Sequence, residues 1–417
     1  MTTSSHSDLT PASWRDTVFN RAVLAAALGN FVNIYDLLLF SVVRIQSLTS
    51  LGVAENELLD VGVRLLNLQM LGMLIGGLLW GVVADRIGRM TVLFASVAMY
   101  SVANIANAYV TNVEWYGALR FLAGVGLAGE LGASITMVSE ALPRLTRGLG
   151  TSFVAGIGVT GAILAAVMSL HSDWQTCYLV GGILGLVALG ARLPLGETAM
   201  FAHMMELKQI RRGQWASLFT DSQRLKRFAR CVLLGMPIWF VIGILATFSP
   251  EICRALGATG VVIAGDSILY FYIGMSTGCL LAGLLSQRWR SRRRAVIIMI
   301  CTMLAVFAAF LSIKQASPEL YYAVFVGLGL CCGYWALFVT IPAEQFGTNL
   351  RATVATSVPN ILRGSVVILT LAVEALTRPI GLMGAIVAVG LSCFVLSFFG
   401  FWRLSESFGR DLDFFEQ

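Results

Sequence analysis

Three ionisable residues lie inside long apolar stretches, where a charge is costly. Asp36 falls in "NFVNIYDLLLF", Arg120 in "WYGALRFLAGVG" and Glu130 in "GLAGELGAS". A charged group in such surroundings is by default a functional residue with a partner, and we expect Asp36 to pair with Arg120. Glu130 lies about 15 Å further along the same helix than Arg120, so it needs its own partner and is a second candidate for protonation. The alternatives are a structural ion pair and a buried, protonated structural Glu130.

A fourth charge lies deep in the second part of the chain, in "VPNILRGSVV", where Arg363 follows Asn360. Its side chain reaches neither surface easily. A guanidinium in a central cavity is suited to binding a carboxylate with two parallel hydrogen bonds, so Arg363 and Asn360 predict a site for a carboxylate-bearing solute. We expect Tyr35, Trp239 and Tyr334 to line the same site, although aromatic residues at helical spacing also serve in plain packing.

Apolar helices that cross a membrane must position these residues. Of the 417 residues, 57% are hydrophobic and 12% are charged, about half the charged fraction of an ordinary soluble domain. Apolar runs of roughly 20 residues, long enough to cross a hydrocarbon core, recur along the chain. We predict an all-α integral membrane protein of twelve transmembrane helices, with spans near 21–46, 62–84, 91–109, 115–138, 149–170, 176–192, 230–249, 262–286, 294–313, 320–342, 352–376 and 380–402.

Lysine and arginine gather in alternate loops between these spans. Such loops stay on the cytoplasmic side, so we expect a multi-pass protein of the plasma membrane, in bacteria the inner membrane, with both termini cytoplasmic. The net charge of +6 is then an orientation signal, and no nucleic-acid partner is expected. Two six-helix halves, 21–192 and 230–404, lie between cytoplasmic tails at 1–20 and 405–417. They are joined by a polar stretch at 193–229, which is either a surface helix or a bland linker.

The two halves carry matching motifs at the joints between helices. The sequence "WGVVADRIGRM" at 80–90 returns in blurred form as "GLLSQRWRSRRR" at 283–294, about 200 residues later. Glu140 and Arg147 are seven residues apart, as are Glu344 and Arg351. Equivalent joints in two halves are typical of a transporter built from parallel repeats.

The first of these joints has the composition of a contact between helix ends. A glycine at position 81 lets its helix approach a neighbour closely, and the carboxylate of Asp85 suits the partly positive N-terminus of another helix. The alternative, a plain orientation loop, explains the arginines but not Asp85 or the second copy. We predict a conformational switch made of Gly81, Asp85, Arg86, Gly88, Arg89, Glu140, Arg147, Arg288, Glu344 and Arg351.

These motifs resemble those of the major facilitator superfamily. "GVVADRIGRM" is similar to the signature Gly-x-x-x-Asp-Arg-x-Gly-Arg of its loop 2–3, and "SEALPRLTRG" resembles the sequence that follows its helix 4. "YDLLLF", "RFLAGVGLAGELGAS" and "LGETAMF" resemble its metabolite:proton symporter branch, which is related to the sugar porters. The second half departs from that branch, since Gln287 replaces the expected acid. The resemblance implies that Asp36 takes a proton, that Arg120 tunes it, and that Asp85 joins the halves in one state and releases them in another.

The function predicted from these observations is proton-coupled symport of a small polar, carboxylate-bearing metabolite, by a monomer that alternates access across the bilayer. The partners are the small-molecule substrate, protons and lipid. We expect no enzyme and no cofactor, because the three histidines are scattered and no nucleotide-binding loop is present. The alternatives are a proton-antiport exporter of a siderophore or drug, and a membrane sensor that transports nothing.

Overall fold

The computed structural model describes residues 19–143, 145–193 and 217–416, and these residues form helices and connecting loops without any strand. The first half of the chain contains α2 (Arg21–Ser50), η2 (Glu55–Glu57), α3 (Leu58–Ile87), α4 (Arg89–Asn107), α5 (Val113–Ala141), α6 (Arg147–Val159), α7 (Gly161–His171) and α8 (Trp174–Ala191). The second half contains α10 (Ser217–Thr220), α11 (Ser222–Leu234), α12 (Met236–Phe240), η3 (Val241–Ala246), α13 (Ser249–Ala255), α14 (Ala264–Arg288), α15 (Arg292–Ser312), α16 (Pro318–Cys332), α17 (Trp335–Gln345) and α18 (Arg351–Trp402).

Eleven helical segments in the described part of the chain are long and apolar enough to cross a membrane. The last of them, α18, has 52 residues and is two helices merged across a break at Gly381. The φ of 73° at this glycine is a conformation that other residues rarely adopt. Counting the two parts separately gives twelve spans, as the apolar runs predicted. The predicted bounds differ from the observed ones by a few residues, except in the seventh span, which begins at Ser222 rather than near 230.

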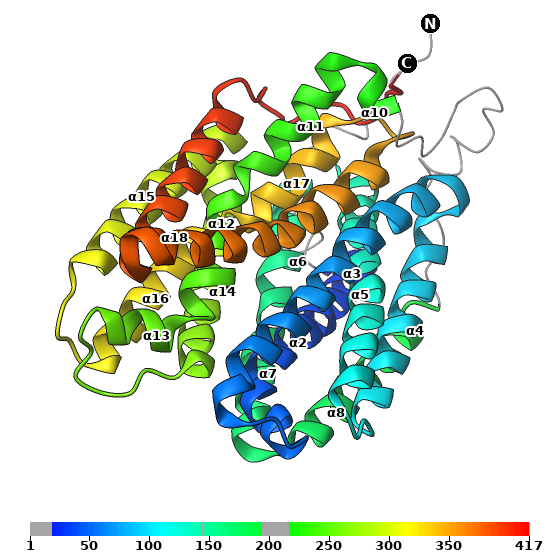
Figure 1. Ribbon diagram of the computed structural model, residues 1–417. Coiled ribbons are helices and arrows are strands. Elements are labelled where there is room, and N and C mark those ends of the chain that lie inside the picture. The colour runs from blue at the N-terminus through cyan, green and yellow to red at the C-terminus, as the bar shows by residue number, and fades with distance from the viewer. Residues whose placement is uncertain (1–18, 144, 194–216, 417) are drawn as a thin grey trace, which may run out of the picture.

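The helices form two bundles that lie side by side (Figure 1), one from α2 to α8 and the other from α11 to α18. The bundles meet where α3 and α5 pack against α18 and where α6 packs against α14 and α17. The chain ends of the described part, at the start of α2 and after α18, lie at the same end of the molecule. We call that end the tail face and the opposite end the far face.

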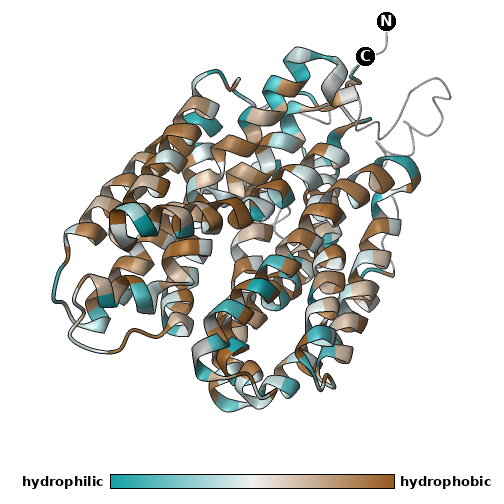
Figure 2. Cartoon of the chain, in the orientation of Figure 1, coloured by the Kyte–Doolittle hydropathy of each residue, from teal (hydrophilic) through white to brown (hydrophobic). Residues whose placement is uncertain are grey.

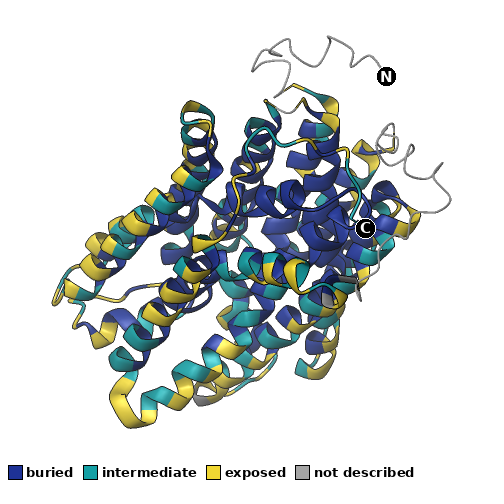
Figure 3. Ribbon diagram, turned by 90° about the horizontal axis from the view of Figure 1, so that it is seen from above, coloured by how far each residue is buried: buried dark blue, intermediate teal, exposed yellow. Residues whose placement is uncertain are grey.

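Hydrophobic residues cover most of the length of the helices (Figure 2), as expected of surfaces that contact lipid. Buried residues gather in the middle of the molecule and exposed ones on its outer helix faces (Figure 3). Large apolar side chains such as Val102, Phe399 and Trp402 are more than half exposed. The predicted surface helix in 193–229 falls mostly outside the described residues; of that stretch, α10 and α11 are described, and α11 continues into the seventh span.

Candidate functional site

Arg363 lies at a small cavity between the two bundles. Its side chain is fully buried, and its Nη1 donates to Oδ1 of Asn360 over 3.1 Å. Its guanidinium carbon lies 5.6 Å from the ring centre of Trp335 and 5.8 Å from that of Trp239. The Nε and Nη2 groups have no hydrogen-bond partner, and no acidic side chain pairs with Arg363 among the described residues. The site therefore holds a cation without a counterion.

The cavity has a volume of about 10 Å³, room for roughly one water molecule. Apolar side chains from both halves make up most of its wall, and the aromatic residues come from the second half. Its lining consists of Ile34, Leu37, Val159, Trp239, Ile242, Tyr272, Met275, Trp335 and Arg363.

Only one of the three aromatic residues predicted for this site, Trp239, lines the cavity. The hydroxyl of Tyr35 donates to the carbonyl of Cys177 in α8 over 2.8 Å, and that of Tyr334 donates to the carbonyl of Leu234 over 3.1 Å. Trp335 lies at the cavity in place of Tyr334, because successive residues of a helix point about 100° apart.

Asn360 connects the site to the other half of the molecule. Its Nδ2 donates to the carbonyl of Ala128 in α5 over 2.9 Å and to the carbonyl of Thr356 over 2.8 Å. Its Oδ1 is the acceptor for Arg363. Asn360 therefore holds the guanidinium in place while its own amide spans the interface between the two bundles.

A polar cluster in the first half contains Asp36 and Arg120, which are both fully buried. Neither carboxylate oxygen of Asp36 has a hydrogen-bond partner, and no ion pair links it to Arg120 among the described side chains. Nη2 of Arg120 instead donates to Oδ1 of Asn104 over 2.6 Å, and the guanidinium lies 4.6 Å from the ring centre of Tyr178. Asn104 and Arg120 nevertheless lie close to the carboxylate of Asp36. The predicted ion pair between Asp36 and Arg120 is therefore not formed in this structure. The two residues instead belong to one polar cluster, in which the carboxylate of Asp36 has no ion-pair partner among the described residues.

Glu130 has a partner that the sequence did not reveal. Both of its carboxylate oxygens accept hydrogen bonds from Arg192, one of them over 2.7 Å, and Ser134 donates to the same carboxylate over 2.9 Å. Arg192 also donates to the carbonyl of Ala25 and is fully buried. Arg192 directly follows the sixth span, where an arginine usually serves as an orientation signal, so the sequence alone does not single it out as a partner of Glu130.

The carboxylate of Asp85 joins the two halves at the tail face. One oxygen accepts from the backbone N–H and the hydroxyl of Thr353 over 2.8 and 2.7 Å, and the other accepts from the backbone N–H of Ala352 over 3.3 Å. These groups belong to the first turn of α18, where backbone N–H groups lack partners within the helix. The hydroxyl of Thr353 also lies 3.2 Å from the carbonyl of Gly81, where α3 and α18 approach closely.

A buried charge network surrounds this contact. Glu140 accepts hydrogen bonds from Arg89 of its own half over 3.1 Å and from Arg351 of the other half over 2.9 Å. Arg89 is the first residue of α4, directly after Gly88, whose φ of 122° makes the sharp joint between α3 and α4. Arg147 is buried at the start of α6, and Arg86 is exposed at the joint.

The corresponding pair in the second half is Arg292 with Glu344, at 3.0 Å. Arg288, which the repeat singled out, is exposed instead. Counted from Gly81 and Gly283, the repeat pairs Arg86 with Arg288 and does not single out Arg292. Alignment on helix starts would have found it, since Arg292 is the first residue of α15 as Arg89 is of α4.

The chain after α18 runs beneath this network. Arg351 donates to the carbonyl of Leu412. The backbone N–H of Thr348 donates to the carbonyl of Phe414 over 2.9 Å, and Arg227 pairs with Glu416 at 2.7 Å.

Glu406, also in this segment, is held in its charged form by hydrogen bonds. Burial raises the pKa of Glu406, but the hydrogen bonds from Ser291 and from the backbone N–H groups of residues 292, 293 and 408 have the larger effect. Together they hold that pKa below its usual value.

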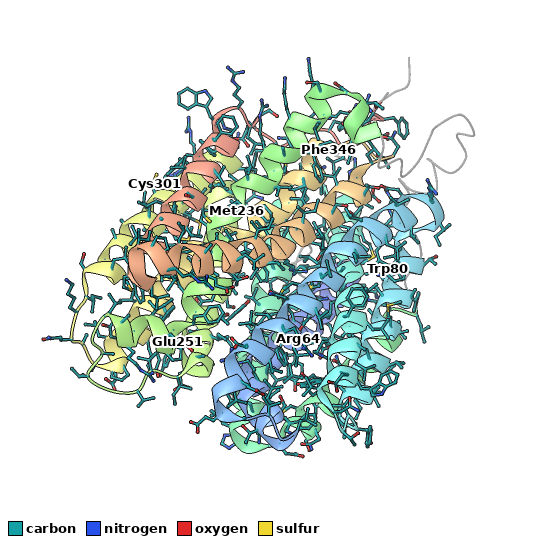
Figure 4. All side chains as sticks on the ribbon, in the orientation of Figure 1. Arg64, Trp80, Met236, Glu251, Cys301 and Phe346 are labelled. Carbon is teal, nitrogen blue, oxygen red and sulfur yellow. The ribbon has the colours of Figure 1, made fainter. Side chains whose placement is uncertain are left out.

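At the far face the two halves are separated by clefts. One, of about 590 Å³, is lined by Arg64 and Asn67 of the first half and by Glu251 and Glu374 of the second. Arg64 on α3 and Glu251 on α13 lie on its two sides (Figure 4). Another, of about 610 Å³, lies between α2 and the residues around Asp266. The molecule is therefore closed between the halves at the tail face and cleft at the far face.

Comparisons with known proteins agree with this architecture. Residues 26–381 match the model of the Major Facilitator Superfamily. The niacin transporter NiaP of Acinetobacter baylyi is 26% identical over 332 residues, which cover 69% of this chain and 72% of the relative. The 3-(3-hydroxy-phenyl)propionate transporter of Escherichia coli is 28% identical over 348 residues, covering 78% and 82%. The proton:xylose symporter XylE, solved with a bound sugar, is 17% identical with a TM-score of 0.72 and covers 94% of this chain and 97% of its own.

Proposed function

Because the chain belongs to the Major Facilitator Superfamily and is therefore a multi-pass membrane transporter rather than an enzyme, we propose that it carries a small aromatic carboxylate together with protons. The single observation that carries this proposal is the buried guanidinium of Arg363, which has two donor groups without a hydrogen-bond partner and no acidic partner among the described residues. A buried cation requires an anion or hydrogen bonds to offset its desolvation. A bound carboxylate supplies both, in a state of the transport cycle in which this cavity is wider than its volume here.

The surroundings of Arg363 favour a planar, apolar body on that carboxylate. Trp239 and Trp335 flank the guanidinium, and the remaining wall is largely aliphatic. Aromatic side chains pack well against a flat ring. The similarity to transporters of niacin and of 3-(3-hydroxy-phenyl)propionate supports the same class of solute.

Asp36 is the residue that we expect to carry the proton. It is a fully buried carboxylate with no hydrogen-bond partner and no ion pair in the described structure. Such a group can exist in a neutral and a charged form at different stages of a cycle, and Arg120 and Asn104 are close enough to act on the charged form. Glu130 is less suited to this role, because Arg192 already neutralises it.

The alternating loop charges support a tail face on the cytoplasmic side, and the bacterial relatives support the inner membrane as its location. In that orientation the clefts open toward the outside and the tail-face network closes the cytoplasmic side. Asp85, Glu140 and Arg351 then have to part when the molecule opens inward, which is the role we assign to the predicted switch.

Transport by the purified protein in liposomes containing a pH-sensitive dye tests the proposal. Addition of nicotinate, benzoate or 3-phenylpropionate outside should acidify the interior faster than in empty liposomes, while succinate and xylose should not. Acidification only when the solute is loaded inside would favour the proton-antiport exporter. Solute binding without any flux would favour the sensor.

A further inference from the structure

Four polar groups around the central cavity have no hydrogen-bond partner among the described residues. They are the indole Nε1 of Trp239, the indole Nε1 of Trp335, and the Nε and Nη2 groups of Arg363, all buried. A buried donor without a partner costs about 1–3 kcal/mol, and native structures retain few of them. The clustering of four donors at one cavity, which has room for about one water molecule in this state, favours a ligand that satisfies them when the cavity is wider.

These groups are close enough to act on one small molecule. The two indole rings are 6.5 Å apart between centres and inclined by 71°, and each lies within 6 Å of the guanidinium carbon of Arg363. They come from α12, α17 and α18, all in the second half. Both indoles and the guanidinium line the same cavity.

The four free groups are all donors. The neighbouring acceptor, Oδ1 of Asn360, is already used by Nη1 of Arg363. A ligand that fits must therefore be rich in acceptors.

The donors also divide into two sets. Nε and Nη2 form one edge of the guanidinium, the edge that binds both oxygens of a carboxylate with parallel hydrogen bonds. A carboxylate on this edge leaves the two indole N–H groups without a partner.

We propose that the indole N–H groups of Trp239 and Trp335 determine specificity by binding a second acceptor on the solute, a ring nitrogen or a hydroxyl oxygen distinct from its carboxylate. The inference rests on the proposed function, because it takes the carboxylate to be held by Arg363. A solute with the same shape but without the second acceptor leaves the indole N–H groups buried and unpaired. Sites built to bind a polar group discriminate strongly against analogues that lack it.

Two matched pairs of acids test this. Nicotinate differs from benzoate by a ring nitrogen in place of a CH group, and 3-(3-hydroxyphenyl)propionate differs from 3-phenylpropionate by one hydroxyl. Calorimetric titration of the purified protein in detergent gives the Kd of each acid. The wild type should bind at least one acceptor-bearing acid about tenfold more tightly than its partner, as expected for about 1.4 kcal/mol.

Trp239→Phe and Trp335→Phe keep an aromatic ring and remove the N–H. At least one of them should weaken binding of the preferred acid about tenfold and change the Kd of its partner by less than about twofold, so that the preference disappears. Trp402→Phe, at a tryptophan that is 78% exposed on the outer surface, is the matched control. It should change the Kd of neither acid. Thermal unfolding of each variant checks that it is folded.

The outcomes separate the two proposals. Equal binding of both members of each pair by the wild type, or an equal weakening of both by the Phe variants, overturns the specificity role and leaves carboxylate transport standing. If the wild type binds none of the four acids, the proposed function fails and the inference fails with it.

Discussion

The two halves of the molecule differ in the surroundings of the buried charges near their centres. In the first half, Glu130 is neutralised by Arg192 and the carboxylate of Asp36 lies near Arg120. In the second half, Arg363 has no acidic partner in the described part of the chain, and its guanidinium lies among indole rings and aliphatic side chains. The two halves share their helix-joint motifs. The difference in their buried charges therefore lies in the interior of the two bundles and not at the joints between helices.

The chemistry of the unpaired groups explains what this difference achieves. A carboxylate can lose its charge by taking up a proton, whereas an arginine stays protonated at neutral pH. An unpaired Asp36 is therefore suited to binding and releasing a proton, and an unpaired Arg363 is suited to holding an anion. The comparison favours a division of labour, in which the first half couples transport to protons and the second half binds the solute.

The largest effect is expected from Asp36→Asn, which cannot change its charge. Accumulation of solute driven by an imposed pH gradient should be abolished, while exchange of labelled for unlabelled solute across liposomes should continue. Glu114→Gln, at an exposed acid on the far face, is the control and should accumulate normally. Full accumulation by the Asp36 variant would remove the proton role from the first half.

Glu130→Gln should mainly affect stability. It leaves Arg192 buried without its counterion, and breaking a buried pair in this way costs about 3–5 kcal/mol. The melting temperature of the purified protein should fall clearly, and the double variant Glu130→Gln/Arg192→Gln should recover much of the loss. A stable single variant that no longer couples to protons would instead make Glu130 a second proton site.

Arg363→Gln should weaken carboxylate binding about 10- to 100-fold, because a hydrogen bond to a charged group contributes about 1.5–3 kcal/mol. Arg363→Lys keeps the charge but loses the edge that forms two parallel hydrogen bonds. Its Kd for the acid should therefore lie between those of the wild type and the Gln variant. Calorimetric titration with the preferred acid measures both. An unchanged Kd in the Gln variant would place the solute outside the second-half site.

Asp85→Asn should have the smallest effect, because it keeps an oxygen that accepts from the N-terminus of α18 and removes the charge, which also faces Arg89 at 3.5 Å. A carboxylate at a helix N-terminus contributes about 0.3–1 kcal/mol. Its loss should raise the fraction of molecules with an open tail face by no more than about fivefold. Maleimide labelling of Thr151→Cys, at a hydroxyl that contacts Thr340 across the halves over 2.8 Å, reports this opening. Asp221→Asn, at a helix start within one half, should leave the labelling rate unchanged.

The membrane spans could be predicted from the sequence because hydrocarbon thickness sets their length. The seventh began earlier than predicted because α11 carries charged residues, which end an apolar run without ending a helix. The buried charged residues could also be predicted from the sequence, because a charged residue within an apolar run is uncommon. Their partners could not, because a partner depends on the depth and rotation of a different helix. Arg192 for Glu130 and Trp335 beside Arg363 are partners of this kind.

The contact of Asp85 with Thr353 joins residues 268 positions apart, which has a consequence for how the protein is made. While the first half emerges from the ribosome, Asp85 and Glu140 have no second half to bind, and Arg89 is a partner that their own half offers to both. The carbonyl of Leu412, which accepts from Arg351, arrives later still. The tail-face closure therefore assembles late, and a nascent chain stalled before residue 412 lacks one of its acceptors.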